Sequence, residues 1–80
     1  MTDKLKEASE ILIELEDDSS IPKNIRQKLK SIIETLRSGE DNSTKVSKVF
    51  QSLEEISEDP NLDPYTRTQI MNVSGILESN

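Results

Sequence analysis

The chain has 80 residues, of which 31% are hydrophobic and 32% are charged, and its formal net charge is -6. This length predicts one domain, close to the smallest size at which a chain buries an adequate core by itself. The sequence contains neither cysteine nor histidine, which excludes disulfides, cysteine metal sites and Ser-His or Cys-His catalytic pairs. The acidic balance opposes non-specific binding to nucleic acid or anionic lipid.

Apolar residues recur at spacings of three and four along the chain, which predicts an all-α protein. The longest apolar run, Ile11-Leu12-Ile13, is far shorter than the roughly 20 residues that a membrane span needs. The N-terminus opens directly into a charged pattern, so no signal peptide is predicted. We therefore expect a cytoplasmic protein with a single helical domain over residues 1–80.

The first predicted helix runs from about Asp3 to Asp17, with Thr2 as its N-cap. Ile13 points away from its apolar stripe and has no obvious place in the core of a monomer. Residues at helical spacing form the expected buried face, namely Leu5, Ala8, Leu12 and Leu15, with Ile11 beside them.

The second predicted helix begins near Pro22, because the missing N–H of proline would be unbonded in a first turn anyway. Ser38-Gly39 is expected to end it, with Gly39 as a left-handed C-terminal cap. The expected buried residues are Ile25, Leu29, Ile32 and Leu36, with Ile33 beside them.

Two further helices are predicted after a short polar link. Asn42 or Ser43 is the expected N-cap of the third, and Asp63 that of the fourth, with Pro64 in its first position. Glycine within a helix costs about 0.5–1 kcal/mol relative to alanine, so Ser74-Gly75 predicts a close approach to another helix. The expected buried residues are Val46, Val49, Phe50, Leu53 and Ile56, then Ile70, Val73 and Leu77.

One turn sequence occurs twice, since residues 18–26 resemble residues 59–67, 41 positions further on. A hairpin with one apolar stripe per helix cannot cover both stripes alone, whereas two hairpins packed face to face can. We expect an antiparallel four-helix bundle of two similar helical hairpins, about residues 2–39 and 43–79, with pseudo-two-fold symmetry.

Basic residues concentrate on the second predicted helix, which favours a position between the acidic first and third helices. Its cationic face offers possible phosphate contacts. Nucleic-acid readers usually add aromatic stacking or a net positive surface, and this chain has one Phe and one Tyr. A solvated face is therefore favoured, with binding of RNA or the ribosome as the alternative. The residues concerned are Lys23, Lys28, Lys30 and Arg37.

Each copy of the turn ends in an arginine, Arg26 or Arg67. In a structural role, each arginine reaches back to an aspartate or to free carbonyls at the end of the preceding helix. In a binding role, it faces an anionic ligand at a helix N-terminus. Nearby acidic residues favour the structural role. Residues Asp59 and Tyr65 join the two arginines as candidates for binding.

Asp59, Asn61 and Asp63 match three positions of a calcium loop. Pro64 stands where that loop requires glycine, and Ile70 where it requires glutamate. A turn followed by an N-cap is the better interpretation, so we expect no metal and no cofactor. The many carboxylates fall on solvated helix faces, and no catalytic residue is predicted.

Four apolar residues, Ile13, Tyr65, Met71 and Ile76, lie outside the predicted central stripes. A contiguous patch of them would suggest self-association or docking of a partner. Our interpretation is a non-enzymatic protein–protein interaction module with an unidentified protein partner, or one that forms a homodimer.

The chain also resembles a small uncharacterised archaeal protein family of about this length. The resemblance rests on residues 18–26, with the pattern D-x-x-I-P-x-N-I-R, and on residues 53–61 and 64–68, which contain D-P-N-x-x-P-x-T-R-T. It implies an all-α intracellular protein with no assigned activity, and it transfers no catalytic residue. The family often has tryptophan where this chain has Met71.

Overall fold

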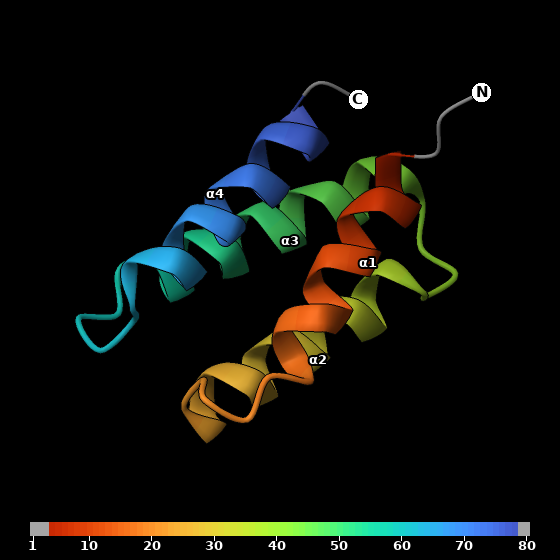
Figure 1. Cartoon of the computed structure of the whole chain (residues 1–80). Helices are drawn as coiled ribbons and strands as arrows, with labels where there is room; N and C mark the ends of the chain where they lie inside the picture. Colours follow the sequence, from red (N-terminus) through yellow and green to blue (C-terminus); the bar gives the residue numbers. More distant parts are fainter. Residues whose placement is uncertain (1–3, 79–80) are drawn as a thin grey trace.

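The computed structural model describes residues 4–78, and this part of the chain contains four helices and no strand (Figure 1). The all-α prediction is confirmed. The predicted cap at Thr2 and helix start at Asp3 lie outside the described residues. None of the described helices is long and apolar enough to cross a membrane. The helices are α1 (Lys4–Glu16), α2 (Lys23–Leu36), α3 (Asn42–Ser57) and α4 (Pro64–Glu78).

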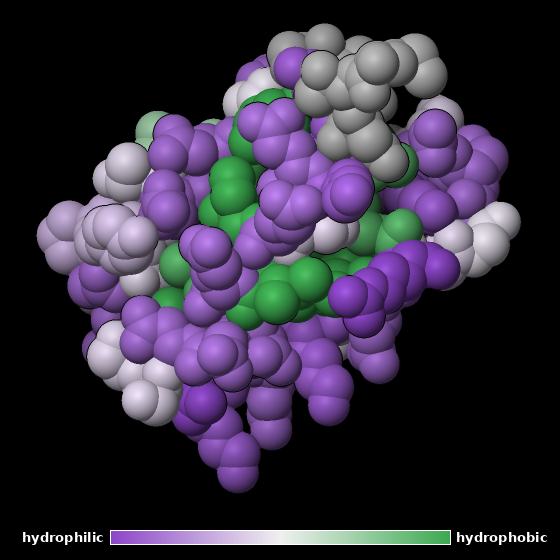
Figure 2. All heavy atoms as spheres, turned by 45° about the vertical axis from the view of Figure 1, so that its right-hand side comes forward, coloured by the Kyte–Doolittle hydropathy of each residue, from purple (hydrophilic) through white to green (hydrophobic). Residues whose placement is uncertain are grey.

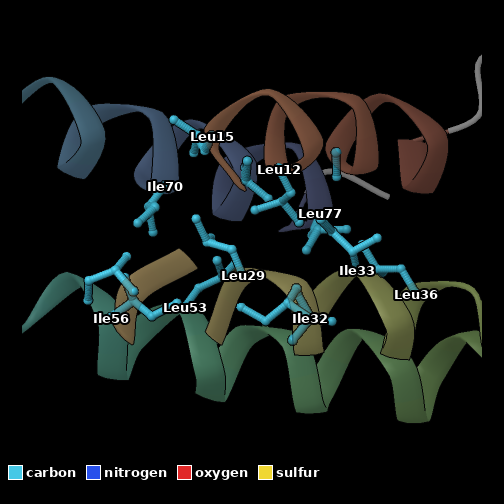
Figure 3. Packing of buried hydrophobic residues seen from close by; sticks show 14 of the residues in the cluster. Leu12, Leu15, Leu29, Ile32, Ile33, Leu36, Leu53, Ile56, Ile70 and Leu77 are labelled. Carbon is cyan, nitrogen blue, oxygen red and sulfur yellow. The ribbon is translucent and has the colours of Figure 1, made fainter. Parts of the chain in front are cut away.

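Each helix packs against the next one along the chain, and α4 also packs against α1. α2 therefore lies between α1 and α3, as the charge pattern predicted. Figure 3 shows α1 and α4 on one side of the core and α2 and α3 on the other. Both the α1–α2 turn and the α3–α4 turn lie at one end of the molecule (Figure 1). This arrangement fits a helical bundle.

All four helices contribute to one hydrophobic cluster (Figure 3). Leu12, Leu29 and Leu53 are fully buried, and burying such a side chain contributes about 1.5–3 kcal/mol. The predicted stripes are confirmed at most positions. Four residues that were expected inside are only partly buried and pack against the edge of the cluster, namely Leu5, Ile11, Val46 and Phe50.

Two turn residues also belong to the core, Ile21 and Leu62, with exposed fractions of 2% and 4%. They occupy the same position of the repeated turn, so each turn is anchored by one aliphatic side chain. Thr66 is buried too, at 1%, in the position that Ile25 holds in the first hairpin. Its hydroxyl donates a hydrogen bond to the Asp63 carboxylate, which satisfies this polar group.

The repeated turns share the same hydrogen bonds. In each, the side chain of the first aspartate, Asp18 or Asp59, accepts a bond from the backbone N–H two residues later, at 2.9 Å. The carbonyl of the same aspartate accepts one from the N–H three residues later, at 3.1 and 3.2 Å. Aspartate favours such turns because its short side chain bonds nearby backbone. The sequence repeat is thus a repeat of local conformation.

The N-cap of α4 is the predicted one, because Asp63 accepts a hydrogen bond from the Thr66 N–H at 3.1 Å. The prediction for α3 was wrong. Asp41, rather than Asn42 or Ser43, has extended backbone angles and accepts the Thr44 N–H at 3.3 Å. The Thr44 hydroxyl adds a bond of 2.6 Å to the same carboxylate, and this pair of donors favours Asp41 as the cap. The cap residue of α2 is Pro22, so that helix begins one residue later than predicted.

The predicted left-handed cap at Gly39 is also wrong, since no described residue has a positive φ. α2 ends at Leu36, and its C-cap residue Arg37 has backbone angles in the right-handed region. Its last carbonyls are satisfied differently: Lys45 Nζ donates to the Leu36 carbonyl at 3.1 Å, and the Ser38 hydroxyl donates to the carbonyl three residues earlier at 2.8 Å. A cation at a helix C-terminus is favourable because it complements the helix dipole.

Gly75 contradicts the prediction of a close helix approach. It is exposed on α4, and a Cβ placed on it would have no atom within 4 Å. Since no packing contact requires this glycine, it lowers helix stability without a compensating contact in the monomer.

We predict that Gly75→Ala raises the free energy of unfolding by about 0.5–1 kcal/mol, because alanine favours the interior of a helix over glycine by about this amount. For a domain of this size the midpoint of thermal unfolding should rise by about 4–8 °C per kcal/mol, as measured by circular dichroism. Gly39→Ala is the control, because Gly39 lies outside the helices. An unchanged or lower midpoint for Gly75→Ala would contradict this account.

Candidate interaction surface

Arg67 connects the beginning of α4 to the end of α3. Its Nε donates to the Ser57 carbonyl at 3.2 Å and its Nη2 to the Asp59 carbonyl at 3.0 Å. The Ser57 carbonyl is at the last residue of α3, where carbonyls lack partners within the helix. The Asp59 carbonyl lies in the following turn and also accepts the Leu62 N–H. The contacts are those that the structural interpretation of the arginine expects, and the Asp59 carboxylate itself binds the Asn61 N–H.

Arg26 makes a different contact from its counterpart in the second hairpin. Its Nε donates to the Ile21 carbonyl at 3.0 Å, inside its own turn. The side chain also lines a polar surface hollow of about 270 Å³ beside Lys23, Glu16 and Asp17. Because both acidic and basic side chains line this hollow, its charge favours neither an anionic nor a cationic ligand.

Tyr65 lies in the first turn of α4 with 64% of its surface exposed. Its hydroxyl accepts a hydrogen bond from the side chain of Gln69 at 3.3 Å. The α1–α2 turn and the α3–α4 turn are close enough for the negative charge of Asp63 to oppose ionisation of Asp18, although hydrogen bonds from Ser20 still lower the pKa of Asp18 overall. Tyr65, Asp59, Arg26 and Arg67 stay predictions as binding residues.

The pKa values of Asp18, Asp41 and Asp63 are all lowered. In each case the largest cause is a hydrogen bond donated by a nearby hydroxyl, and the second is a backbone N–H. Hydrogen bonds to the ionised form favour it, so these carboxylates are anionic caps and turn residues. General acid catalysis at neutral pH requires the opposite shift.

The calcium-loop interpretation gains no support from the geometry. Asp59 holds its turn through the Asn61 N–H, and Asp63 caps α4. Across residues 4–78, no group of three or more carboxylates is placed to hold a metal ion.

The basic residues of α2 do not form one face. Lys23, Lys30 and Arg37 follow one another at intervals of seven and line the side of α2 next to α1. Lys28 is two residues from Lys30, so it projects roughly 200° away around the helix. All four are exposed. Acidic side chains lie among the three aligned cations, namely Glu16, Asp17 and Glu34.

The four apolar candidates do not form one patch. Ile13, Tyr65 and Met71 are exposed, at 39%, 64% and 63%. Ile76 is partly buried and packs against the core, so the prediction that it lies outside was wrong. On the face shown in Figure 2, hydrophobic side chains appear as strips between hydrophilic ridges.

Two shallow grooves contain two of the exposed apolar candidates, Ile13 and Met71. The α1–α2 groove, of about 300 Å³, includes Ile13, and the α3–α4 groove, of about 240 Å³, includes Met71. The α1–α2 groove is lined by Ile13, Glu16, Lys30, Ile33, Glu34 and Arg37. The α3–α4 groove is lined by Leu53, Glu54, Ser57, Ile70, Met71, Ser74, Gly75 and Glu78.

The two grooves occupy the same place in the sequence repeat. Adding 41 to each residue number of the α1–α2 groove gives a residue that lines the α3–α4 groove. The chemistry differs, however, because three larger side chains are replaced by Ser57, Ser74 and Gly75. Sequence reasoning missed both grooves. The available signal for the α3–α4 groove was the pair Ser74-Gly75, which was interpreted as a helix contact.

Four helices and no strand among residues 4–78, with shallow grooves along two helix pairs, define a small all-α protein. The model of an uncharacterised protein family, UPF0147, matches residues 1–79. The chain therefore belongs to this family, whose matching relatives are archaeal.

Relatives share about a third of their residues with the chain. A UPF0147 protein of Aeropyrum pernix is 35% identical over 77 residues, covering 95% of this chain and 85% of the relative. One of Methanothermobacter thermautotrophicus is 39% identical over 72 residues, covering 89% and 71%. A crystal structure of a protein of unknown function is similar with a TM-score of 0.92 at 35% identity, covering 98% of this chain and 90% of that one.

We predict that Arg67→Met lowers the free energy of unfolding by about 1.5–3 kcal/mol, because it leaves carbonyls at the end of α3 without a charged donor. The measurement is chemical denaturation followed by circular dichroism. Arg26→Met is the matched control and should cost less, since one hydrogen bond inside the turn is lost. Equal stability of Arg67→Met and the wild type would rule out the structural role.

The lowered pKa of Asp63 predicts a loss of stability in acid. Because hydrogen bonds from Thr66 hold the folded pKa of Asp63 below the ordinary value of an aspartate, the ionised carboxylate stabilises the fold above that ordinary value. This stabilisation is lost as pH falls through the folded pKa. Asparagine caps helices about as well as aspartate, so Asp63→Asn should resemble the wild type at pH 7. Between about pH 5 and pH 2 its unfolding midpoint should fall less steeply than that of the wild type. Parallel pH profiles for the two proteins would contradict the prediction.

Proposed function

We propose that the chain is a non-enzymatic protein–protein interaction module of the cytoplasm. In this proposal it is one domain, an antiparallel four-helix bundle of two similar hairpins with pseudo-two-fold symmetry. The matching hydrogen bonds of the two turns and the matching positions of the two grooves support the duplication.

A non-enzymatic role is supported by how the polar groups are used. The carboxylates with lowered pKa cap helices or close turns. Among the described residues, no buried side-chain nitrogen or oxygen lacks a hydrogen-bond partner. Catalytic sites usually hold reactive groups in a concave pocket that fixes their geometry, whereas the hollows here are open and shallow.

The observation that carries the interaction proposal is Met71, exposed at 63% beside an open groove whose lining includes core residues Leu53 and Ile70. Leu53 and Ile70 are themselves buried, so the apolar surface of the groove that a partner can contact comes chiefly from Met71. An exposed large apolar side chain on a hollowed surface favours docking of a partner. Methionine is common on binding surfaces because it is flexible and polarisable.

The second candidate is an accessory protein of RNA or the ribosome. Its support is the exposed row of Lys23, Lys30 and Arg37 along α2. The acidic neighbours of this row and the net charge of -6 both weaken attraction to phosphates.

Affinity capture from native cytosol, with and without nuclease, tests the interaction proposal. We predict that a protein partner is retained after nuclease treatment and by a variant with alanine at all four basic positions of α2. Phosphate binding weakens steeply as salt rises, so a steep loss of the partner in salt would favour the second candidate. Loss of all partners on nuclease treatment would overturn the interaction proposal. The four positions are Lys23, Lys28, Lys30 and Arg37.

A further inference from the structure

We propose that the α3–α4 groove binds a basic amphipathic helical segment of another protein, with apolar side chains toward the groove and Lys or Arg beside them. This inference rests on the proposed interaction function and adds the site and the chemistry of the partner.

The shape of the groove suits an apolar side chain. Leu53 and Ile70 lie under the groove and are already buried, at 0% and 1% exposed, so a docked side chain would contact Met71, exposed at 63%, above them. Ser57 and Ser74 are small, and Gly75 has open space where a side chain would stand. Met71 lies beside them, and its flexible thioether can adapt to a docked side chain.

The charge of the groove selects a basic occupant. Glu54 and Glu78 are both exposed, and no described residue that lines the groove is basic. The cations of the same two helices are engaged elsewhere. Lys45 binds a carbonyl of α2, Lys48 pairs with a glutamate at 2.7 Å, and Arg67 binds the end of α3. The two carboxylates are thus available to a Lys or Arg of a partner.

The length of the groove suits a helix. On α4 its lining residues follow at intervals of three, four and seven from Met71 to Glu78, a distance of about 10 Å along the helix axis. This corresponds to about two helical turns. A helix laid between two others presents side chains at the same intervals, which is a common mode of peptide recognition.

A second copy of this chain is a less suitable occupant. The α1–α2 groove of another copy carries Lys30 and Arg37 at the positions of Met71 and Glu78, so its charge is partly complementary. Contact between two unlike grooves is head-to-tail, however, and such contacts give rings or open chains rather than closed dimers. The net charge of -6 also opposes association of identical copies.

The test is an NMR titration of the isotope-labelled full chain with a synthetic peptide of about 15 residues, with leucine at helical spacing and lysine elsewhere. The matched control peptide has glutamate in place of lysine. We expect chemical-shift changes centred on Glu54, Met71 and Gly75, and binding at least about tenfold weaker for the control peptide.

The variant Gly75→Gln distinguishes binding in the α3–α4 groove from general attraction of the peptide to an acidic surface. The variant keeps the net charge, and its Cβ has room in the monomer, so the fold should be retained while the groove is filled. Binding of the lysine peptide should weaken at least about tenfold. Gly39→Gln also keeps the net charge, and its Cβ has the same open space, at an exposed position outside the helices and the groove. It is the matched control and should bind nearly as the wild type does.

Three outcomes would overturn the inference. Equal peptide binding by Gly75→Gln and the wild type would show attraction to an acidic surface only. Sedimentation that shows self-association of the wild type, abolished by Gly75→Gln, would identify a second copy as the occupant. If Gly75→Gln retains the protein partner captured from cytosol, the groove is not the site, although the interaction function stands. Absence of any captured protein would instead remove the interaction function itself.

Discussion

Burial of four narrow apolar stripes is the constraint on which this structure depends. Less than a third of the chain is hydrophobic, so each helix can cover only part of the core. Leu12, Leu29, Leu53 and Ile70 come from four different helices and meet in one cluster. No pair of helices could exclude water from these side chains alone, and the free energy of folding therefore comes from joining all four.

The α1–α2 turn and the α3–α4 turn hold these stripes in register, and the two turns differ in some of the hydrogen bonds that stabilise them. Both are closed by an aspartate and anchored in the core by Ile21 or Leu62. The second adds the Asp63 cap and the contact of Arg67 with the end of α3. The turn of the second hairpin is therefore held by more side-chain hydrogen bonds than that of the first.

Local features of the fold were predictable because they depend on neighbouring residues. The spacing of apolar residues gave the helices and most of the core, and Asp63 followed by Pro64 gave the start of α4. Predictions failed at Gly39, where a lysine from the next helix satisfies the carbonyls, and at Gly75, where no neighbouring helix approaches. Both failures concern contacts between segments. The α3–α4 groove was missed for the same reason, because its surface belongs to two helices.

The sequence by itself determined the helices, the repeated turn, the acidic balance and the absence of cysteine and histidine chemistry, because these follow from residue types and their spacing. Tertiary structure decided which donors satisfy the helix ends, that Ile13 and Met71 lie in separate grooves, and that acidic side chains lie among the aligned cations of α2. The physical reason is that apolar periodicity fixes which face of a helix is buried. What lies beside that face depends on the neighbouring helices.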